Sequence, residues 1–196
     1  MEAGKEVIIG IDLAALEKNP TGWTYWKNRR VSTCHLHNDE EVINSTVHHK
    51  PLIVAIDAPL TMPKTGTTRK ADKEMLKHGY PVFPPLMCSM KTLTKRAISL
   101  THALRASGQS VIEVHPASTR KALGMPTKDW QKIQTLLKQI GLKGNLEIRT
   151  LTPHEIDATT AAMTAYLHLR GKTREIGDKE EGYIVIPKRN DWRRLK

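Results

Sequence analysis

The sequence lacks the features that mark membrane proteins, secreted proteins and zinc proteins. Its apolar runs are all far shorter than the roughly 20 residues that a membrane-spanning helix needs. The opening residues, MEAGKEVIIG, contain no secretory signal. There are only two cysteines, Cys34 and Cys88, and they form neither a CxxC pair nor a zinc-ligand spacing. We therefore expect a globular protein of a reduced intracellular compartment, with a cytoplasmic location.

Length and composition fit one domain of ordinary size, because 196 residues with 39% hydrophobic content are enough to bury a core. We expect a single domain over residues 1–196. Several prolines interrupt residues 60–90, which predicts an irregular insertion or lid. The tail 188–196 holds 5 basic residues in 9, which fits either a disordered phosphate-binding arm or a feature that aids solubility.

Positive charge is concentrated in the middle of the chain. The whole sequence has 31 basic and 20 acidic residues, a net charge of +11, and residues 61–149 hold 16 of the basic and only 5 of the acidic ones. A basic field attracts polyanions, nucleic acid first. Charge alone is equally consistent with a basic protein that binds no nucleic acid.

The residue patterns predict an α/β fold. Three closely spaced strands favour antiparallel pairing, whereas the crossovers that precede the next two strands favour pairing parallel to the first. The helix that starts near residue 127 takes Thr127 as its N-cap and Gly141 as its C′ residue. The expected strands cover residues 6–12, 22–27, 29–37, 52–57 and 110–116, with a final hairpin over 173–189. The expected helices cover residues 39–49, 68–79, 90–107, 117–123, 127–142 and 152–171.

Four carboxylates stand where this fold would bring them together. Asp12, Asp57 and Glu113 come late in three predicted strands, and Asp157 is at the fifth position of the helix over 152–171. Glu155 fits the N3 position of a capping box, so we interpret it as a cap. Clustered carboxylates without cysteine or histidine ligands suit Mg²⁺ or Mn²⁺, and two ions about 3.5–4 Å apart would support phosphodiester hydrolysis. Each acid alone also fits strand-end hydrogen bonding or a surface ion pair.

Other side chains around this predicted site are candidates for contact with substrate. His115 and His154 lie beside candidate acids and fit either proton shuttles or structural hydrogen bonders. Phe83 fits either stacking on a base or packing of the insertion. Arg69 and Asp72 are also spaced as an i, i+3 ion pair. The candidate phosphate contacts, each of which also fits a solvated basic surface, are Lys64, Arg69, Lys70, Lys91, Lys95 and Arg105.

A set of motifs in this order resembles one family. The segments are GIDLA, TGW, AIDAPL, the R-x-x-D of Arg69 and Asp72, GYPVFPP, IEVHPA, HEIDATTAA and EEGYIVIP. Over about residues 7–187 the chain is similar to the domain of unknown function 429, a family of predicted nucleases of ribonuclease H-like fold. The resemblance implies a mixed sheet of three antiparallel strands followed by two parallel ones. It also implies acids at Asp12, Asp57 and Asp157, and gives less support to Glu113.

Together these patterns predict a nuclease that hydrolyses DNA or RNA with a carboxylate-bound Mg or Mn centre. The metal ligands expected are Asp12, Asp57, Glu113 and Asp157. A non-catalytic nucleic-acid-binding protein is the first alternative, since the basic surface alone would support salt-dependent binding. A phosphotransferase of the actin or sugar-kinase type is the second, although no Gly-Thr phosphate hairpin directly follows Asp12.

Overall fold

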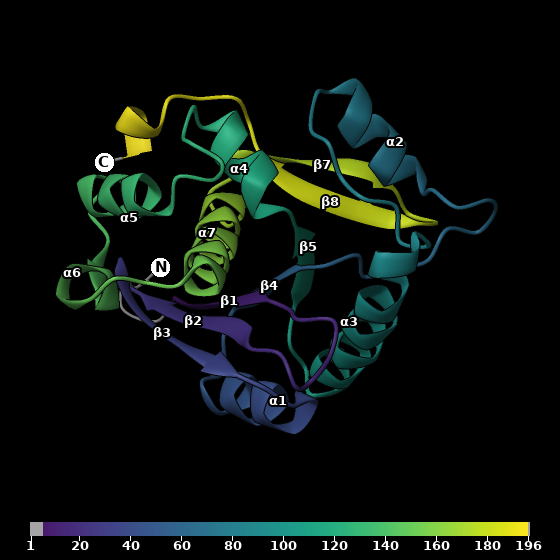
Figure 1. Ribbon diagram of the computed structural model, residues 1–196, viewed down its shortest axis with the longest axis horizontal. Helices are drawn as coiled ribbons and strands as arrows, with labels where there is room; N and C mark the ends of the chain where they lie inside the picture. Colours follow the sequence, from purple (N-terminus) through teal and green to yellow (C-terminus); the bar gives the residue numbers. More distant parts are fainter. Residues whose placement is uncertain (1–5, 196) are drawn as a thin grey trace.

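The computed structural model describes residues 6–195, which form a mixed eight-stranded sheet flanked by helices (Figure 1). The strands are β1 (Val7–Asp12), β2 (Thr21–Lys27), β3 (Arg30–Leu36), β4 (Ile53–Asp57), β5 (Val111–Val114), β6 (Lys143–Gly144), β7 (Thr173–Asp178) and β8 (Gly182–Pro187). The helices are α1 (Asp39–His48), α2 (Lys70–Lys77), α3 (Cys88–Ala106), α4 (Pro116–Ala122), α5 (Trp130–Gln139), α6 (Asn145–Ile148) and α7 (Pro153–His168).

The strand order across the sheet is β6-β3-β2-β1-β4-β5-β8-β7. Strands β1, β2 and β3 pair antiparallel, and β4 and β5 follow in parallel with β1, as the sequence predicts. The final hairpin adds β8 in parallel beside β5 and β7 antiparallel at the edge. Asn28 and Arg29 join β2 to β3 with positive φ angles of 50° and 59°, as a tight two-residue hairpin turn requires.

Helices cover both faces of the sheet (Figure 1). Apolar residues of α5 and α7 pack on one face against β1, β4, β5 and β8, while α1 and α3 cover the other face. Helix α2 packs beside the β7–β8 hairpin in a smaller cluster that includes Met75 and Tyr80. The inner strands β1 and β4 are therefore buried on both sides, which explains why their sequences show no polar alternation.

Helix α7 lies unusually close to the centre of the sheet. It begins with the predicted capping box, in which Glu155 accepts a hydrogen bond from the Thr152 amide at 2.9 Å. Opposite β1 the helix carries alanines, and a Cβ built on Gly10 would lie 2.5 Å from the Ala162 nitrogen and closer still to the Ala158 carbonyl oxygen. Only glycine fits here, so the backbones of strand and helix are in direct contact.

Two local predictions differ from the structure. Helix α5 takes Asp129 as its N-cap rather than Thr127, because the Asp129 carboxylate accepts a hydrogen bond from the Lys132 amide at 3.0 Å. Gly141, with φ of 100°, ends this helix as predicted. The basic tail is not a disordered arm up to residue 195, because Trp192–Leu195 form a 3₁₀ helix and Leu195 is buried. Lys196 lies outside the described residues.

None of the helices within residues 6–195 combines the length and the apolar character needed to cross a membrane.

Candidate functional site

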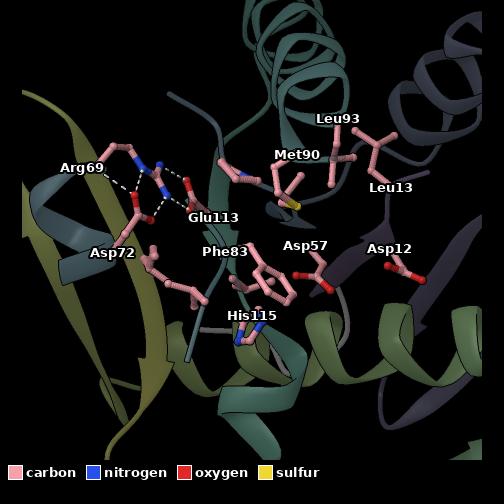
Figure 2. A pocket seen from close by; sticks show the side chains of 15 residues that line it. Asp12, Leu13, Asp57, Arg69, Asp72, Phe83, Met90, Leu93, Glu113 and His115 are labelled. Carbon is pink, nitrogen blue, oxygen red and sulfur yellow. Dashed lines mark hydrogen bonds and ion pairs between the residues drawn. The ribbon is translucent and has the colours of Figure 1, made fainter. Parts of the chain in front are cut away.

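Asp12 and Asp57 are neighbours at the carboxyl ends of β1 and β4. They are the last residues of two adjacent parallel strands and stand opposite each other in the register. Both line a cavity of about 190 Å³, and Figure 2 shows their carboxylates side by side above the turns of α7. Open α/β sheets bind ligands beyond the carboxyl ends of their strands, so the position is typical of a functional site.

The electrostatic environment of Asp57 is unfavourable for a carboxylate on its own. Burial raises the pKa of Asp57 well above its usual range, and repulsion from Asp12 and then from Asp157 raises it further. No side chain or amide within residues 6–195 donates a hydrogen bond to this carboxylate. A proton or a cation on Asp57 would relieve this repulsion.

His154 connects the first turn of α7 to this pair. Its Nδ1 lies 2.7 Å from Oδ2 of Asp12, and this hydrogen bond raises the pKa of His154. The close approach of α7 to the sheet produces the contact, since the His154 backbone also lies against Gly22 of β2. Whether His154 transfers protons remains a prediction, but its position beside a candidate ligand is established.

Asp157, on the next turn of α7, is close enough to Asp12 and Asp57 for charge repulsion, but it already has a partner. It pairs with the guanidinium of Arg120, a residue of α4 that is only 1% exposed. Burial raises the pKa of Asp157, an effect that Arg120 opposes and Asp12 reinforces. The sequence offered no signal for Arg120, because a single arginine in a short helix matches no motif.

Glu113 lines the same cavity as Asp12 and Asp57, but both of its oxygens already have partners, so its role as a metal ligand stays a prediction. Its two oxygens accept hydrogen bonds from the Arg69 guanidinium at 2.6 and 2.8 Å, and one also accepts from the Leu60 amide at 2.8 Å. Burial raises the pKa of Glu113 while these hydrogen bonds oppose the rise. The dashed lines in Figure 2 join Arg69 to Glu113 and Asp72. With the bond from the Leu60 amide, they tie the segment after β4 to β5.

Arg69 is likewise not available for the phosphate contact predicted from the sequence. It is fully buried and donates to Asp72 at 2.8 Å as well as to Glu113, which confirms the alternative i, i+3 pairing. The Arg69 guanidinium thus donates hydrogen bonds to the carboxylates of both Asp72 and Glu113. A buried guanidinium shared by two carboxylates has a structural role, because removing one of the three side chains leaves an unpaired buried charge and destabilises the fold.

The other predicted basic contacts lie on the surface. Lys64 and Lys70 face the acidic turn of the β7–β8 hairpin, with Nζ atoms 3.0 Å from Glu180 and 3.7 Å from Asp178. The remaining three, all on α3, are exposed: Lys91, Lys95 and Arg105. Their contact with nucleic acid stays a prediction.

The rest of the cavity wall combines apolar side chains with the buried Arg69, Asp72 and Glu113. Met90 and Leu93 of α3 stand on one side, and Phe83, 66% exposed, stands nearer to His115 (Figure 2). His115 is a structural hydrogen bonder, since its Nδ1 accepts from the Ser118 amide at 3.3 Å as the N-cap of α4. Burial and the charge of Arg120 lower the pKa of His115 to about 4, so the ring is neutral at neutral pH.

The donor set fits a hard divalent cation only in part. In the described part of the chain, no three His, Cys, Asp or Glu side chains are grouped closely enough to hold a metal ion. Asp12 and Asp57 remain as paired oxygen donors, and the unfavourable charge at Asp57 is of the kind that a cation removes. Mg²⁺ is commonly bound by one or two carboxylates with several waters, so these two residues fit that mode.

The comparisons with known proteins agree with the fold. Residues 10–182 match the family described as "Protein of unknown function (DUF429)", and no curated protein matches the chain. Among solved structures, RuvC of T. thermophilus in complex with a Holliday junction substrate is similar, with a TM-score of 0.50 and 16% identity over 85% of this chain and 96% of that one. A second Thermus thermophilus RuvC structure gives a TM-score of 0.44 and 16% identity over 84% and 96%. The predicted ribonuclease H-like fold, which RuvC shares, is therefore confirmed.

Proposed function

This chain belongs to the DUF429 family, and from that premise we propose that it is a metal-dependent nuclease that hydrolyses phosphodiester bonds in DNA or RNA. Asp12 and Asp57 would hold Mg²⁺ or Mn²⁺. The proposal rests on one observation: Asp12 and Asp57 stand opposite each other at the ends of two parallel strands, on the wall of a cavity. The ribonuclease H-like fold supports it.

The protein's own residues prepare this site for a cation. Asp12 and Asp57 would hold the ion, whose charge would favour the deprotonated form of Asp57 and offset its repulsion with Asp12. His154 hydrogen-bonds to Oδ2 of Asp12 and so orients that carboxylate. A bound divalent cation would supply an activated water and neutralise charge that develops on the phosphate.

The surface around the cavity supports a polyanionic substrate. Lys91 and Lys95 are exposed on the same helix whose Met90 and Leu93 line the cavity. The RuvC structure that is similar to this chain contains Holliday junction DNA. We propose that the exposed basic residues contact phosphates, and that Phe83, which segment 60–90 contributes to the cavity wall, contacts the substrate.

The experiment measures metal binding and nucleic-acid cleavage on the same set of variants. Calorimetry with Mn²⁺ is carried out on the natural protein and on Asp12→Asn and Asp57→Asn, beside cleavage of labelled single-stranded, duplex and branched DNA and RNA. Asp191→Asn is the matched control, because Asp191 is in the tail and pairs with Arg193. We expect both site variants to lose Mn²⁺ binding and cleavage together and the control to retain both.

Two outcomes would contradict the proposal. Mn²⁺ binding that survives in both site variants would show that the metal lies elsewhere. Salt-dependent nucleic-acid binding without cleavage or metal binding would favour the non-catalytic binding protein instead.

A further inference from the structure

Arg120 occupies a position that bears on how many ions the proposed site holds. We propose that the Arg120 guanidinium takes the place of a second cation, so that the centre binds one divalent ion, at Asp12 and Asp57. This inference rests on the proposed function. It differs from the two-ion centre that the sequence alone suggests.

The first argument is that Arg120 is fixed in place. One of its terminal nitrogens donates to Asp157 and, at 3.3 Å, to the Thr160 hydroxyl, while the other donates to the Thr127 carbonyl oxygen at 3.0 Å. The guanidinium carbon also lies 5.4 Å from the centre of the Trp130 ring. Contacts on several sides of a side chain that is 1% exposed leave it no path to solvent.

The second argument concerns the third carboxylate that a second ion would need from the described residues around the site. Glu113 is held by Arg69, and Glu155 pairs with Arg149 at 2.5 Å, at the cap of α7. A second ion would need Asp157 as a ligand, and Asp157 already has a partner in the buried guanidinium. Arginine keeps its charge at every accessible pH, so the partner cannot be neutralised by losing a proton.

The third argument is the balance of charge. Asp12, Asp57 and Asp157 with Arg120 have a formal charge of −2, and Glu113, Asp72 and Arg69 on the same cavity wall add −1, so one divalent ion cancels most of the charge. A second divalent ion would leave this set of residues with an excess of +1 beside a buried guanidinium. Like charges in a poorly solvated site repel strongly, so the second ion is disfavoured before substrate arrives.

The experiment counts ions rather than turnover. Mn²⁺ is titrated by calorimetry at pH 8 into the natural protein, Arg120→Lys and Arg120→Gln, and the bound Mn²⁺ is examined by electron paramagnetic resonance. We expect one isolated Mn²⁺ in the natural protein and in the lysine variant, which keeps the positive charge. In the glutamine variant, Asp157 is released, and we expect a second Mn²⁺ with a spin-coupled spectrum.

Two results would overturn the inference. The first is the binding of two Mn²⁺ ions with comparable affinity to the natural protein. If Asp57→Asn then abolishes Mn²⁺ binding and cleavage, the proposed nuclease function stands and only the role of Arg120 fails. The other is a single Mn²⁺ in a folded Arg120→Gln variant. No Mn²⁺ in the natural protein would overturn the inference and the proposed metal centre together.

Asp157→Asn keeps the test decisive if Arg120→Gln fails to fold. A residue that does not ligate the ion can be neutralised with a modest loss of affinity, so we expect one Mn²⁺ bound within about tenfold of the natural affinity. This range corresponds to the removal of one nearby charge. A loss of a hundredfold or more would identify Asp157 as a ligand and overturn the inference.

Discussion

Replacing Gly10 by alanine tests whether the contact between β1 and α7 builds the site. The added Cβ would lie 2.5 Å from the Ala162 nitrogen and 2.9 Å from its Cβ, with the Ala158 carbonyl oxygen closer still. Ordinary contacts begin near 3.4 Å. The helix must therefore retreat from the sheet by about an ångström, because backbone atoms cannot rotate out of the way.

The expected cost follows from this displacement. Overpacking a core commonly costs about 1–3 kcal/mol, and a clash with backbone belongs at the upper end. For a chain of this size, about 3 kcal/mol lowers the melting temperature by roughly 6–12 °C. The retreat also moves His154 and Asp157 away from Asp12 and Asp57, so we expect Mn²⁺ binding and any cleavage to weaken more than global stability alone explains.

Thermal melting and Mn²⁺ calorimetry on Gly10→Ala measure both effects. Ser32→Thr is the matched control, since it adds one methyl group at an exposed position of β3. The double variant Gly10→Ala with Ala162→Gly removes one clash but leaves the backbone contacts, so it should not restore stability. Natural stability in Gly10→Ala, or full rescue in the double variant, would refute the reasoning.

Three further predictions concern the charged groups. Asp57→Asn should stabilise the metal-free protein at neutral pH by roughly 1–3 kcal/mol, which is the Coulomb energy of two carboxylates on adjacent strands at moderate dielectric. Because the pKa of Asp57 is raised, the natural protein loses stability as pH rises from about 4 upward. The stability gained by the variant, measured by urea unfolding, should therefore grow over that pH range and vanish in acid. Arg69→Met should cost about 3–5 kcal/mol by the same assay, because Glu113 and Asp72 become unpaired buried charges, and a neutral result would show that the pair is not structural. His154→Gln should lower stability below the ordinary histidine pKa of about 6.5 and have progressively less effect as pH rises through the raised folded-state pKa, and an effect that is constant with pH would contradict the ion pair.

The central part of the fold and half of the site follow from sequence patterns. Close spacing and crossovers predicted the directions of the first five strands, because those connections leave few alternatives. Asp12 and Asp57 stood out because an acid late in a buried strand has to emerge at the sheet rim. The capping box of α7 was visible for a similar reason, since its partners are three residues apart.

The rest depended on contacts between distant residues. Glu113 looked equivalent to Asp57, but its partner Arg69 comes from an irregular segment 44 positions away, where no periodicity predicts direction. Arg120 and Asp157 are 37 positions apart and meet only when α4 docks on α7. Long-range ion pairs leave no local signature, so sequence reasoning assigned a ligand role to Glu113 and no role to Arg120.

The parallel pairing of β1 with β4 also has a kinetic consequence. The acids at positions 12, 57 and 157 come together only after a crossover has closed and α7 has docked, both of which are long-range contacts. We expect their mutual repulsion to be absent from a folding transition state in which α7 is not yet packed. In that case the repulsion raises the unfolding rate and leaves the folding rate nearly unchanged.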